Sequence, residues 1–487
     1  MRRDFRLAIS LGVLLVLQAA SCSRVNRPER GVSLTPCRID GFPEEIQCAS
    51  VSVPESRSGA SDRRVSIHVA IVPALSRVAA PDPLVLLAGG PGQAASSFGP
   101  WIASVFAPIR RHRDILLIDQ RGTGLSQALR CRAGESSTAA LVLEREEQAS
   151  RECLASLDGD PRHYANGAAM EDLDEIRSAL GYTQLNLWGG SYGTRAALVY
   201  MRAHPERVRS AVLDGVAPWS LRFPLHTARD GERALSRLLD DCATAPDCSA
   251  AFPALRAHLA DLLRRLSADP AAVTTADPRT GVSRSVRITR DEFAVALRGF
   301  LYVASLASAV PLVIERAYSG DFAPFLALGQ AVAGWSMETM SLGMTRAVLC
   351  SEDLPRIGDH EIDDLTRGTT VGRAEVALWR ASCAPWPRAE LPADASMPVR
   401  FDGPVLLLSG DLDPVVPPQW AEEVRATMPR ARHVIAPGVG HNVTPAGCAP
   451  ELVAAFIERA DAMTLDASCL TELKRPPFAT SPGGWRP

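Results

Sequence analysis

The sequence Gly-Gly-Ser-Tyr-Gly at residues 189–193 constrains the fold of this chain more than any other feature. It follows the apolar run Leu185–Trp188 and precedes a stretch with helical spacing. Because Gly189 and Gly193 lack Cβ atoms, the chain can turn sharply from strand to helix there without a steric clash. Such a turn exposes the Ser191 hydroxyl at the end of a strand, where it can act as a nucleophile. The alternative is an ordinary glycine-rich turn with a serine that caps a helix.

Short apolar runs bounded by turn residues recur on both sides of this turn. Runs of this kind are typical of strands buried on both faces of a parallel sheet. We expect strands near 65–72, 83–88, 115–119, 185–188, 208–213, 404–409 and 433–436, and helices near 101–109, 170–180 and 422–428. The alternation predicts an α/β protein whose mostly parallel sheet carries helices on both faces.

The strand pattern stops after about residue 217 and returns near residue 401. The residues between them are mostly helical in pattern, with breaks at proline and glycine. We therefore predict one α/β core, formed by residues 62–217 and 401–487, with a mainly helical cap inserted at 218–400. Residues 23–61 are predicted to form a polar lead segment.

Residues 1–22 have the pattern of a signal peptide. Arginines come first, and the apolar stretch Leu7–Ala20 is too short to span a bilayer comfortably. Cleavage before Cys22 would leave a lipidated N-terminal cysteine, as in bacterial lipoproteins. Ordinary signal-peptidase cleavage is the alternative, because Ala19 stands where lipoprotein signals usually have leucine. We predict an exported bacterial protein, periplasmic or extracellular, with membrane attachment if Cys22 is lipidated.

The cysteine count agrees with export. The chain has 11 cysteines, so an even number remains when Cys22 is set aside. In an oxidising compartment the remaining cysteines would form disulfides, although sequence alone does not fix their connectivity. Pairing in order of sequence would join Cys37 to Cys48, Cys131 to Cys153, Cys242 to Cys248, Cys350 to Cys383 and Cys448 to Cys469. No Cys-x-x-Cys motif occurs, which argues against a zinc site.

A serine nucleophile needs a histidine base and an acid that orients the histidine. Asp411 and Asp413 directly follow the predicted strand 404–409, and His441 follows the predicted strand 433–436. Sites in α/β folds lie at the carboxyl ends of the strands, so these side chains should lie near the nucleophile. Only one aspartate is needed for this role. The other would bind its own loop.

An attack on a carbonyl also needs N–H donors for the negative charge that develops on oxygen. The backbone amide of Tyr192, directly after the nucleophile, is one candidate. The amide of Gly90 is the other, in the sequence Gly-Gly-Pro-Gly at residues 89–92. A surface turn is the alternative interpretation of that sequence. A phosphate-binding loop is excluded, because no Gly-Lys-Ser or Gly-Lys-Thr follows.

Together these motifs resemble the tripeptidyl-aminopeptidase-like and proline iminopeptidase branch of the α/β-hydrolase superfamily. The matching segments are residues 89–92, 119–126, 189–194, 410–414 and 440–441. The resemblance implies the α/β-hydrolase fold, with a C-terminal region like that of tripeptidyl aminopeptidases. It implies that Ser191 is the nucleophile, Asp413 rather than Asp411 the acid, and His441 the base. It also implies release of residues or short peptides from a free N-terminus.

An enzyme of this kind must bind the α-ammonium group of its substrate, and a buried carboxylate would do so. Glu352 and Asp353 are the candidates, with a solvated loop as the alternative. Ala88 and Val416 stand where the family often has histidine and threonine, which leaves the substrate subclass open.

We therefore predict an exported serine hydrolase that works through an acyl-enzyme and needs no metal or organic cofactor. Its substrate would be a peptide or a small ester. The net charge of −3 and the lack of a long basic run argue against a nucleic-acid partner. A carboxylesterase on the same triad is one alternative. A non-catalytic, lipid-anchored binding protein on a hydrolase fold is the other.

Overall fold

A computed structural model describes residues 31–131, 143–276, 281–481 and 483. The predicted signal segment and the lipidation candidate Cys22 lie outside the described residues. Within the described ranges, none of the helices has both the length and the apolar character needed to cross a lipid bilayer.

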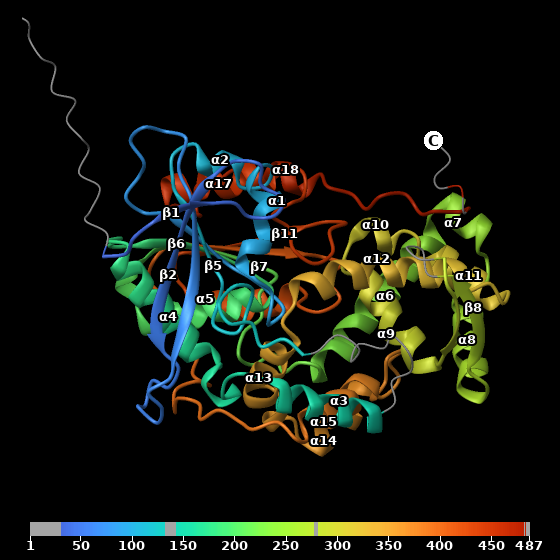
Figure 1. Cartoon of the computed structure of the whole chain (residues 1–487). Helices are drawn as coiled ribbons and strands as arrows, with labels where there is room; N and C mark the ends of the chain where they lie inside the picture. Colours follow the sequence, from blue (N-terminus) through green and yellow to red (C-terminus); the bar gives the residue numbers. More distant parts are fainter. Residues whose placement is uncertain (1–30, 132–142, 277–280, 482, 484–487) are drawn as a thin grey trace, which may run out of the picture.

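The described residues form one nine-stranded sheet in the order β1-β2-β3-β5-β4-β6-β7-β10-β11 (Figure 1). The strands are β1 Thr35–Cys37, β2 Ile46–Pro54, β3 Arg64–Val72, β4 Leu84–Leu87, β5 Ile115–Ile118, β6 Leu185–Gly190, β7 Val208–Asp214, β10 Val405–Gly410 and β11 Ala431–Ala436. Pairing is antiparallel from β1 through β3 to β5 and parallel across the rest. This mostly parallel sheet confirms the predicted fold class.

Helices cover both faces of the sheet because its central strands are apolar on both sides. Along β4, Val85 and Leu87 pack into one core and Leu84 and Leu86 into the other. The first core is covered by α4 Asn166–Ala179, α5 Tyr192–Ala203 and α16 Pro418–Arg425. The second is covered by α1 Gly99–Ile102, α2 Ala107–Arg110, α17 Ala449–Arg459 and α18 Ser468–Thr471.

The single helix expected at 101–109 is two one-turn helices, α1 and α2. A proline stands in the first turn of each, at Pro100 and Pro108. Because proline has no N–H, Pro108 cannot continue the hydrogen bonding of the preceding helix.

The sheet also includes β1 and β2, which lie inside the segment 23–61 that the sequence predicts as a polar lead. Strand β2 pairs with β3 from Gln47 to Pro54, which is all of the strand except its first residue. Its serines alternate with valines at residues 50–53. Polar residues on one face of an antiparallel strand are compatible with a sheet whose other face packs on the core.

Residues 218–400, called the cap below, follow β7 and precede β10. Their helices are α6 Leu225–Thr244, α7 Pro246–Ala251, α8 Leu255–Ala268, α9 Arg290–Phe300, α10 Ala304–Ala307, α11 Val310–Tyr318, α12 Ala323–Thr339, α13 Leu342–Glu352, α14 Asp359–Thr366 and α15 Ala374–Cys383. Helix α3 Leu143–Ser156, from the core sequence, packs against α15. The cap lies beside and below the sheet in Figure 1.

One feature of the cap was not expected from the sequence. Strands β8 Ala271–Ala276 and β9 Ser283–Ile288 pair antiparallel within the otherwise helical segment. Along β8 every second residue is exposed and the apolar side chains are small, so no continuous apolar run marks the strand.

Five disulfides occur among the described residues, and they join the same pairs that sequence order predicts. The C-terminal segment after α18 runs from the core across to the cap (Figure 1). There the N–H of Ala479 donates to the carbonyl of Ser308 at 3.0 Å. Core and cap are therefore also joined through the end of the described chain.

Candidate active site

Ser191 lies at the turn between β6 and α5, with a positive φ of 56°. Its N–H donates to the carbonyl of Asp214 at the end of β7, at 2.9 Å. A Cβ on Gly193 would lie 2.0 Å from the carbonyl oxygen of Leu87, and one on Gly189 would lie 2.5 Å from that of Gly193. Both glycines are needed because backbone atoms occupy the space of a side chain.

Gly193→Ala should therefore destabilise the protein strongly. The added methyl would meet the backbone of β4 in the middle of the sheet. We expect the free energy of unfolding to fall by at least about 3 kcal/mol, measured by urea denaturation. The matched control is Gly167→Ala in α4, where a Cβ meets no atom within 4 Å. It should change stability by less than about 1 kcal/mol. Equal stability of the two variants would contradict the steric argument.

His441 and Asp413 form a buried pair at the carboxyl ends of β11 and β10. Nδ1 of His441 lies 2.8 Å from Oδ2 of Asp413. The other carboxylate oxygen of Asp413 accepts the N–H groups of Val415 and Val416, at 2.8 and 2.9 Å. Burial raises the pKa of Asp413, but the charge of His441 and these hydrogen bonds outweigh it and hold the pKa below its usual value.

Asp411 binds the loops around it, as expected for the aspartate that does not orient the histidine. Its Oδ1 accepts the N–H of Gly438 at 2.7 Å, which ties together the loops that follow β10 and β11. Burial raises its pKa. Asp413, rather than Asp411, is thus the carboxylate that the structure places against His441.

The pKa of His441 reflects two opposing effects. Burial of the imidazole lowers it, whereas the charge of Asp413 and its hydrogen bond raise it. The net pKa lies above the usual value. A carboxylate that favours the imidazolium suits a group that must accept a proton during a reaction.

Asp214 holds the loop that carries the histidine, and sequence reasoning missed it. Its carboxylate accepts the N–H groups of Val443 and Thr444, both at 2.7 Å, and the Thr444 hydroxyl at 2.6 Å. The same residue accepts the Ser191 N–H through its carbonyl. The only sequence signal for Asp214 is its place at the end of a buried strand.

A cavity of about 480 Å³ brings the predicted residues together. Ser191 and His441 both line it, and so do Gly90 and Tyr192. Asp413 is fully buried behind the histidine. The structure thus places the three side chains of the predicted triad at one site, although they come from distant parts of the sequence. The rest of the wall is largely apolar and includes Phe98, Trp101, Trp188, Phe223 and Leu306.

The two predicted N–H donors have suitable environments. Tyr192 is the first residue of α5, where an amide has no acceptor within its own helix. Gly90 is exposed at the cavity, while Gly89 and Pro91 on either side are buried. Gly90 has a φ of 106°, which favours glycine. Residues 90–92 are a turn, and its exposed residue Gly90 borders the cavity.

The loop 89–92 is held from the cap by α13. The Thr345 hydroxyl donates to the carbonyl of Pro91 at 2.6 Å, and the Ser341 N–H donates to that of Gly92 at 2.9 Å. A Cβ on Gly92 would lie 2.7 Å from the carbonyl oxygen of Ser341. The close packing of these backbones fixes the loop.

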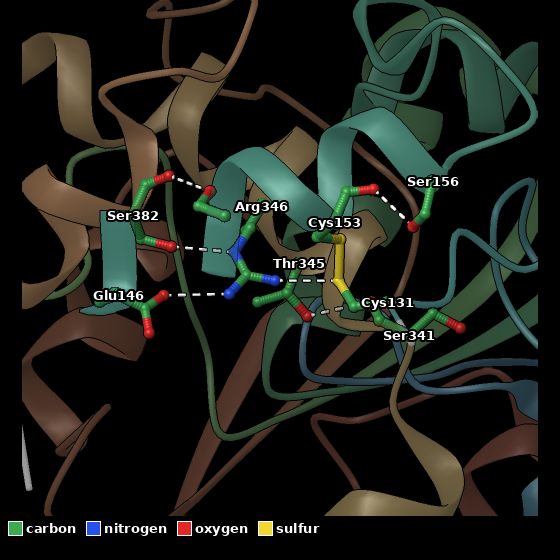
Figure 2. Close-up of a disulfide and its surroundings, with 9 residues drawn as sticks. Cys131, Glu146, Cys153, Ser156, Ser341, Thr345, Arg346 and Ser382 are labelled. Carbon is green, nitrogen blue, oxygen red and sulfur yellow. Dashed lines mark hydrogen bonds and ion pairs between the residues drawn. A yellow bond between two sulfur atoms is a disulfide. The ribbon is translucent and has the colours of Figure 1, made fainter. Parts of the chain in front are cut away.

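Helix α13 is itself anchored by one disulfide and contacts a second through Arg346. The Cys350–Cys383 disulfide joins it to α15. Arg346 donates to the sulfur of Cys131 at 3.0 Å and to Glu146 at 3.0 Å, next to the Cys131–Cys153 disulfide (Figure 2). The cysteines thus fix a helix that contacts the site.

Glu352 and Asp353 lie at the end of α13, and their exposed fractions are 1% and 0%. The alternative, that they belong to a solvated loop, is therefore wrong. Glu352 accepts the backbone and side-chain N–H groups of Asn166, and burial raises its pKa. Asp353 accepts a hydrogen bond from Arg195 at 2.8 Å and lines the cavity. Asp353 is therefore the acid of this pair that borders the site.

A second Ser–His–Glu arrangement lies elsewhere in the core. Nε2 of His433 lies 3.0 Å from Oγ of Ser409, and Nδ1 lies 2.6 Å from Glu422. Ser409 has no solvent exposure. A substrate carbonyl cannot reach it, so similar contacts alone do not make a reactive serine. Over the described part of the chain, no group of three metal-binding side chains is found.

Two families of known proteins match the chain. Residues 82–251 match the family described as alpha/beta hydrolase fold, and residues 370–469 match the family described as TAP-like protein. Three curated relatives are similar over part of their length. The serine protease Hip1 of Mycobacterium tuberculosis is 26% identical over 254 residues, which are 46% of this chain and 48% of the relative.

The second relative is a tripeptidyl aminopeptidase of Streptomyces coelicolor, 27% identical over 218 residues, covering 41% of this chain and 40% of the relative. The third is a proline iminopeptidase of Neisseria meningitidis, 32% identical over 135 residues, covering 28% and 32%. The chain thus spans less than half the length of these relatives. With its sheet order and the turn at Ser191, the chain has the α/β-hydrolase fold and resembles the tripeptidyl-aminopeptidase-like and proline iminopeptidase branch of that superfamily.

Proposed function

We propose that this protein is an exported serine hydrolase that cleaves peptides from a free N-terminus. The observation that carries the proposal is the buried His441–Asp413 pair, which faces a cavity that Ser191 also lines. Oγ of Ser191 attacks the substrate carbonyl while His441 takes its proton. Asp413 keeps Nδ1 of the imidazole protonated and stabilises the positive charge.

The backbone amides of Gly90 and Tyr192 hold the oxygen that becomes negative in the attack. His441 then returns the proton to the leaving amine, and water hydrolyses the acyl-enzyme by the same steps in reverse order. Every group in these steps belongs to the chain, to the substrate or to the attacking water.

Preference for a free N-terminus is proposed from two sources. Two relatives carry the names tripeptidyl aminopeptidase and proline iminopeptidase, and both names describe enzymes that act on peptides. In this chain, Asp353 supplies a carboxylate at the cavity wall, with Glu352 directly before it in the sequence. A substrate ammonium group would share Asp353 with Arg195, which is already bound to it.

The test compares an aminoacyl p-nitroanilide with its N-acetylated form and with a p-nitrophenyl ester. Loss of a charge-assisted hydrogen bond in a buried site should lower kcat/KM by about 10- to 100-fold on acetylation. An equal rate for the free and blocked anilides would reject the aminopeptidase proposal.

A carboxylesterase is the second candidate, and one observation favours it. Asp353 already accepts hydrogen bonds from Arg195, Arg356 and the N–H of Phe223, so its carboxylate is largely occupied. Fast cleavage of the ester, with slow cleavage of both anilides, would support this alternative.

Export is supported by the five disulfides among the described residues, because such bonds persist in oxidising compartments. The signal segment 1–22 and lipidation at Cys22 remain predictions from the sequence. Mass spectrometry of the mature N-terminus would distinguish a lipidated Cys22 from ordinary cleavage.

A further inference from the structure

Tyr302 of the cap contacts the histidine of the candidate triad. It lies between α9 and α10, and its carbonyl accepts the backbone N–H of His441 at 2.8 Å. Its ring packs edge-on against the imidazole, with 5.1 Å between ring centroids. A Cβ on Gly440 would lie 2.5 Å from the same carbonyl oxygen, so the fit is close. The cap therefore positions the histidine as well as covering the site.

Tyr302 is in turn held by a buried ion pair within the cap. Arg298 of α9 donates to the Tyr302 hydroxyl at 3.3 Å and to Glu375 of α15 at 2.5 Å. Glu375 also accepts the Thr227 hydroxyl at 3.0 Å. Arg298 and Glu375 are 8% and 6% exposed, so water screens them little. Gly231 of α6 leaves room for Arg298, because a Cβ there would lie 2.8 Å from its Cδ.

We propose that Arg298, neutralised by Glu375, is a positioning residue that holds Tyr302 against His441 and places a compensated charge near the imidazole. The proposal rests on the proposed function, because it takes His441 as the base. It assigns to the cap a role in the acid–base step, in addition to any role in substrate choice.

The charges that face His441 come from three elements. Asp413 after β10 and Asp214 at the end of β7 favour the imidazolium, whereas Arg298 of α9 disfavours it. Glu375 is paired with Arg298 and partly cancels its charge. Removing the arginine charge should therefore raise the pKa of His441. Removing the glutamate charge leaves Arg298 uncompensated and should lower the pKa of His441.

The experiment measures kcat/KM against pH for the wild type, Arg298→Met and Glu375→Gln, with Arg298→Lys as the control that keeps the charge. A base must be neutral to act, so activity rises with pH through the pKa of His441. The midpoint of this rise should move up by about 0.5 pH in Arg298→Met and down by about 0.5 pH in Glu375→Gln. Arg298→Lys should keep the wild-type midpoint to within half of that shift.

If Arg298 and Glu375 had only a structural role, the midpoints of Arg298→Met and Glu375→Gln would stay together or move in the same direction. Either result would overturn the proposal. If the charge variants fail to fold, Tyr302→Phe decides, because it removes only the hydroxyl that Arg298 binds. We expect its kcat to fall about 3- to 10-fold with KM unchanged, as a modest hydrogen bond would give. A wild-type kcat in Tyr302→Phe would overturn the proposal.

Different results would exclude the proposed function and the role of Arg298. If Ser191→Ala retains activity, the proposed function is wrong. If a fluorophosphonate labels Ser191 and the wild type shows the histidine midpoint, but the variants do not separate, then only the role of Arg298 is wrong.

Discussion

Ser191→Ala should lower kcat by about 10⁴- to 10⁶-fold, because it removes the atom that forms the acyl-enzyme. The substitution keeps the Cβ atom and leaves the turn between β6 and α5 unchanged, so folding should be preserved. The measurement is turnover of the p-nitroanilide, with circular dichroism to confirm the fold. Ser409→Ala is the matched control, since Ser409 also hydrogen-bonds a histidine but is fully buried. The control should keep wild-type kcat.

Chemical labelling gives an independent result. A fluorophosphonate probe should label the wild type and Ser409→Ala but not Ser191→Ala. A wild type that takes no label and shows no turnover would favour the alternative of a non-catalytic binding protein. Undiminished turnover in Ser191→Ala would instead mean that another group carries the reaction.

Asp413→Asn should lower kcat by about 10⁴-fold, the second largest effect expected. An asparagine amide can present its NH₂ group to the imidazole, which favours the wrong tautomer and leaves the imidazolium without a counter-charge. Asp411→Asn is the control, because the carboxylate of Asp411 accepts the loop N–H of Gly438 and does not contact His441 through any hydrogen bond seen among the described residues. Its activity should stay within about 10-fold of wild type, since one hydrogen bond is weakened.

The comparison that matters is the loss of kcat in Asp413→Asn relative to the loss in Asp411→Asn. Equal losses in Asp413→Asn and Asp411→Asn would mean that general disturbance of the loop after β10 explains both. A larger loss in Asp411→Asn would contradict the contact seen between Asp413 and His441.

Much of the core could be predicted because its signals are local. The strand before Ser191 is an apolar run, and glycines mark the turn that follows. The positions of Asp413 and His441 after later strands follow from the same kind of signal. The pair of strands β8 and β9 gave no such signal, because β8 consists of alanines, threonines and one valine and has no run of large apolar residues.

The supporting residues could not be predicted because their contacts are long-range. Asp214 binds Thr444, which is 230 residues further along the chain. Arg298 pairs with Glu375 across 77 residues. Asp214 is marked in the sequence only by its place at the end of an apolar strand, and nothing near Arg298 or Glu375 distinguishes them from surface charges. The burial of Asp353 likewise depends on Arg195 of α5, which provides its counter-charge.

Helix α13 has a further mechanical consequence. It carries Thr345, which holds the loop at Pro91, and Asp353 caps its C-terminal end. Thr345 and Asp353 are eight positions apart, which corresponds to about 12 Å along the helix axis. Because the Cys350–Cys383 disulfide also holds this helix against α15, neither end of the helix can shift without displacing the other. Under the proposed function, this helix therefore sets the distance between the ammonium group that Asp353 would bind and the carbonyl oxygen that the loop at Gly90 would hold.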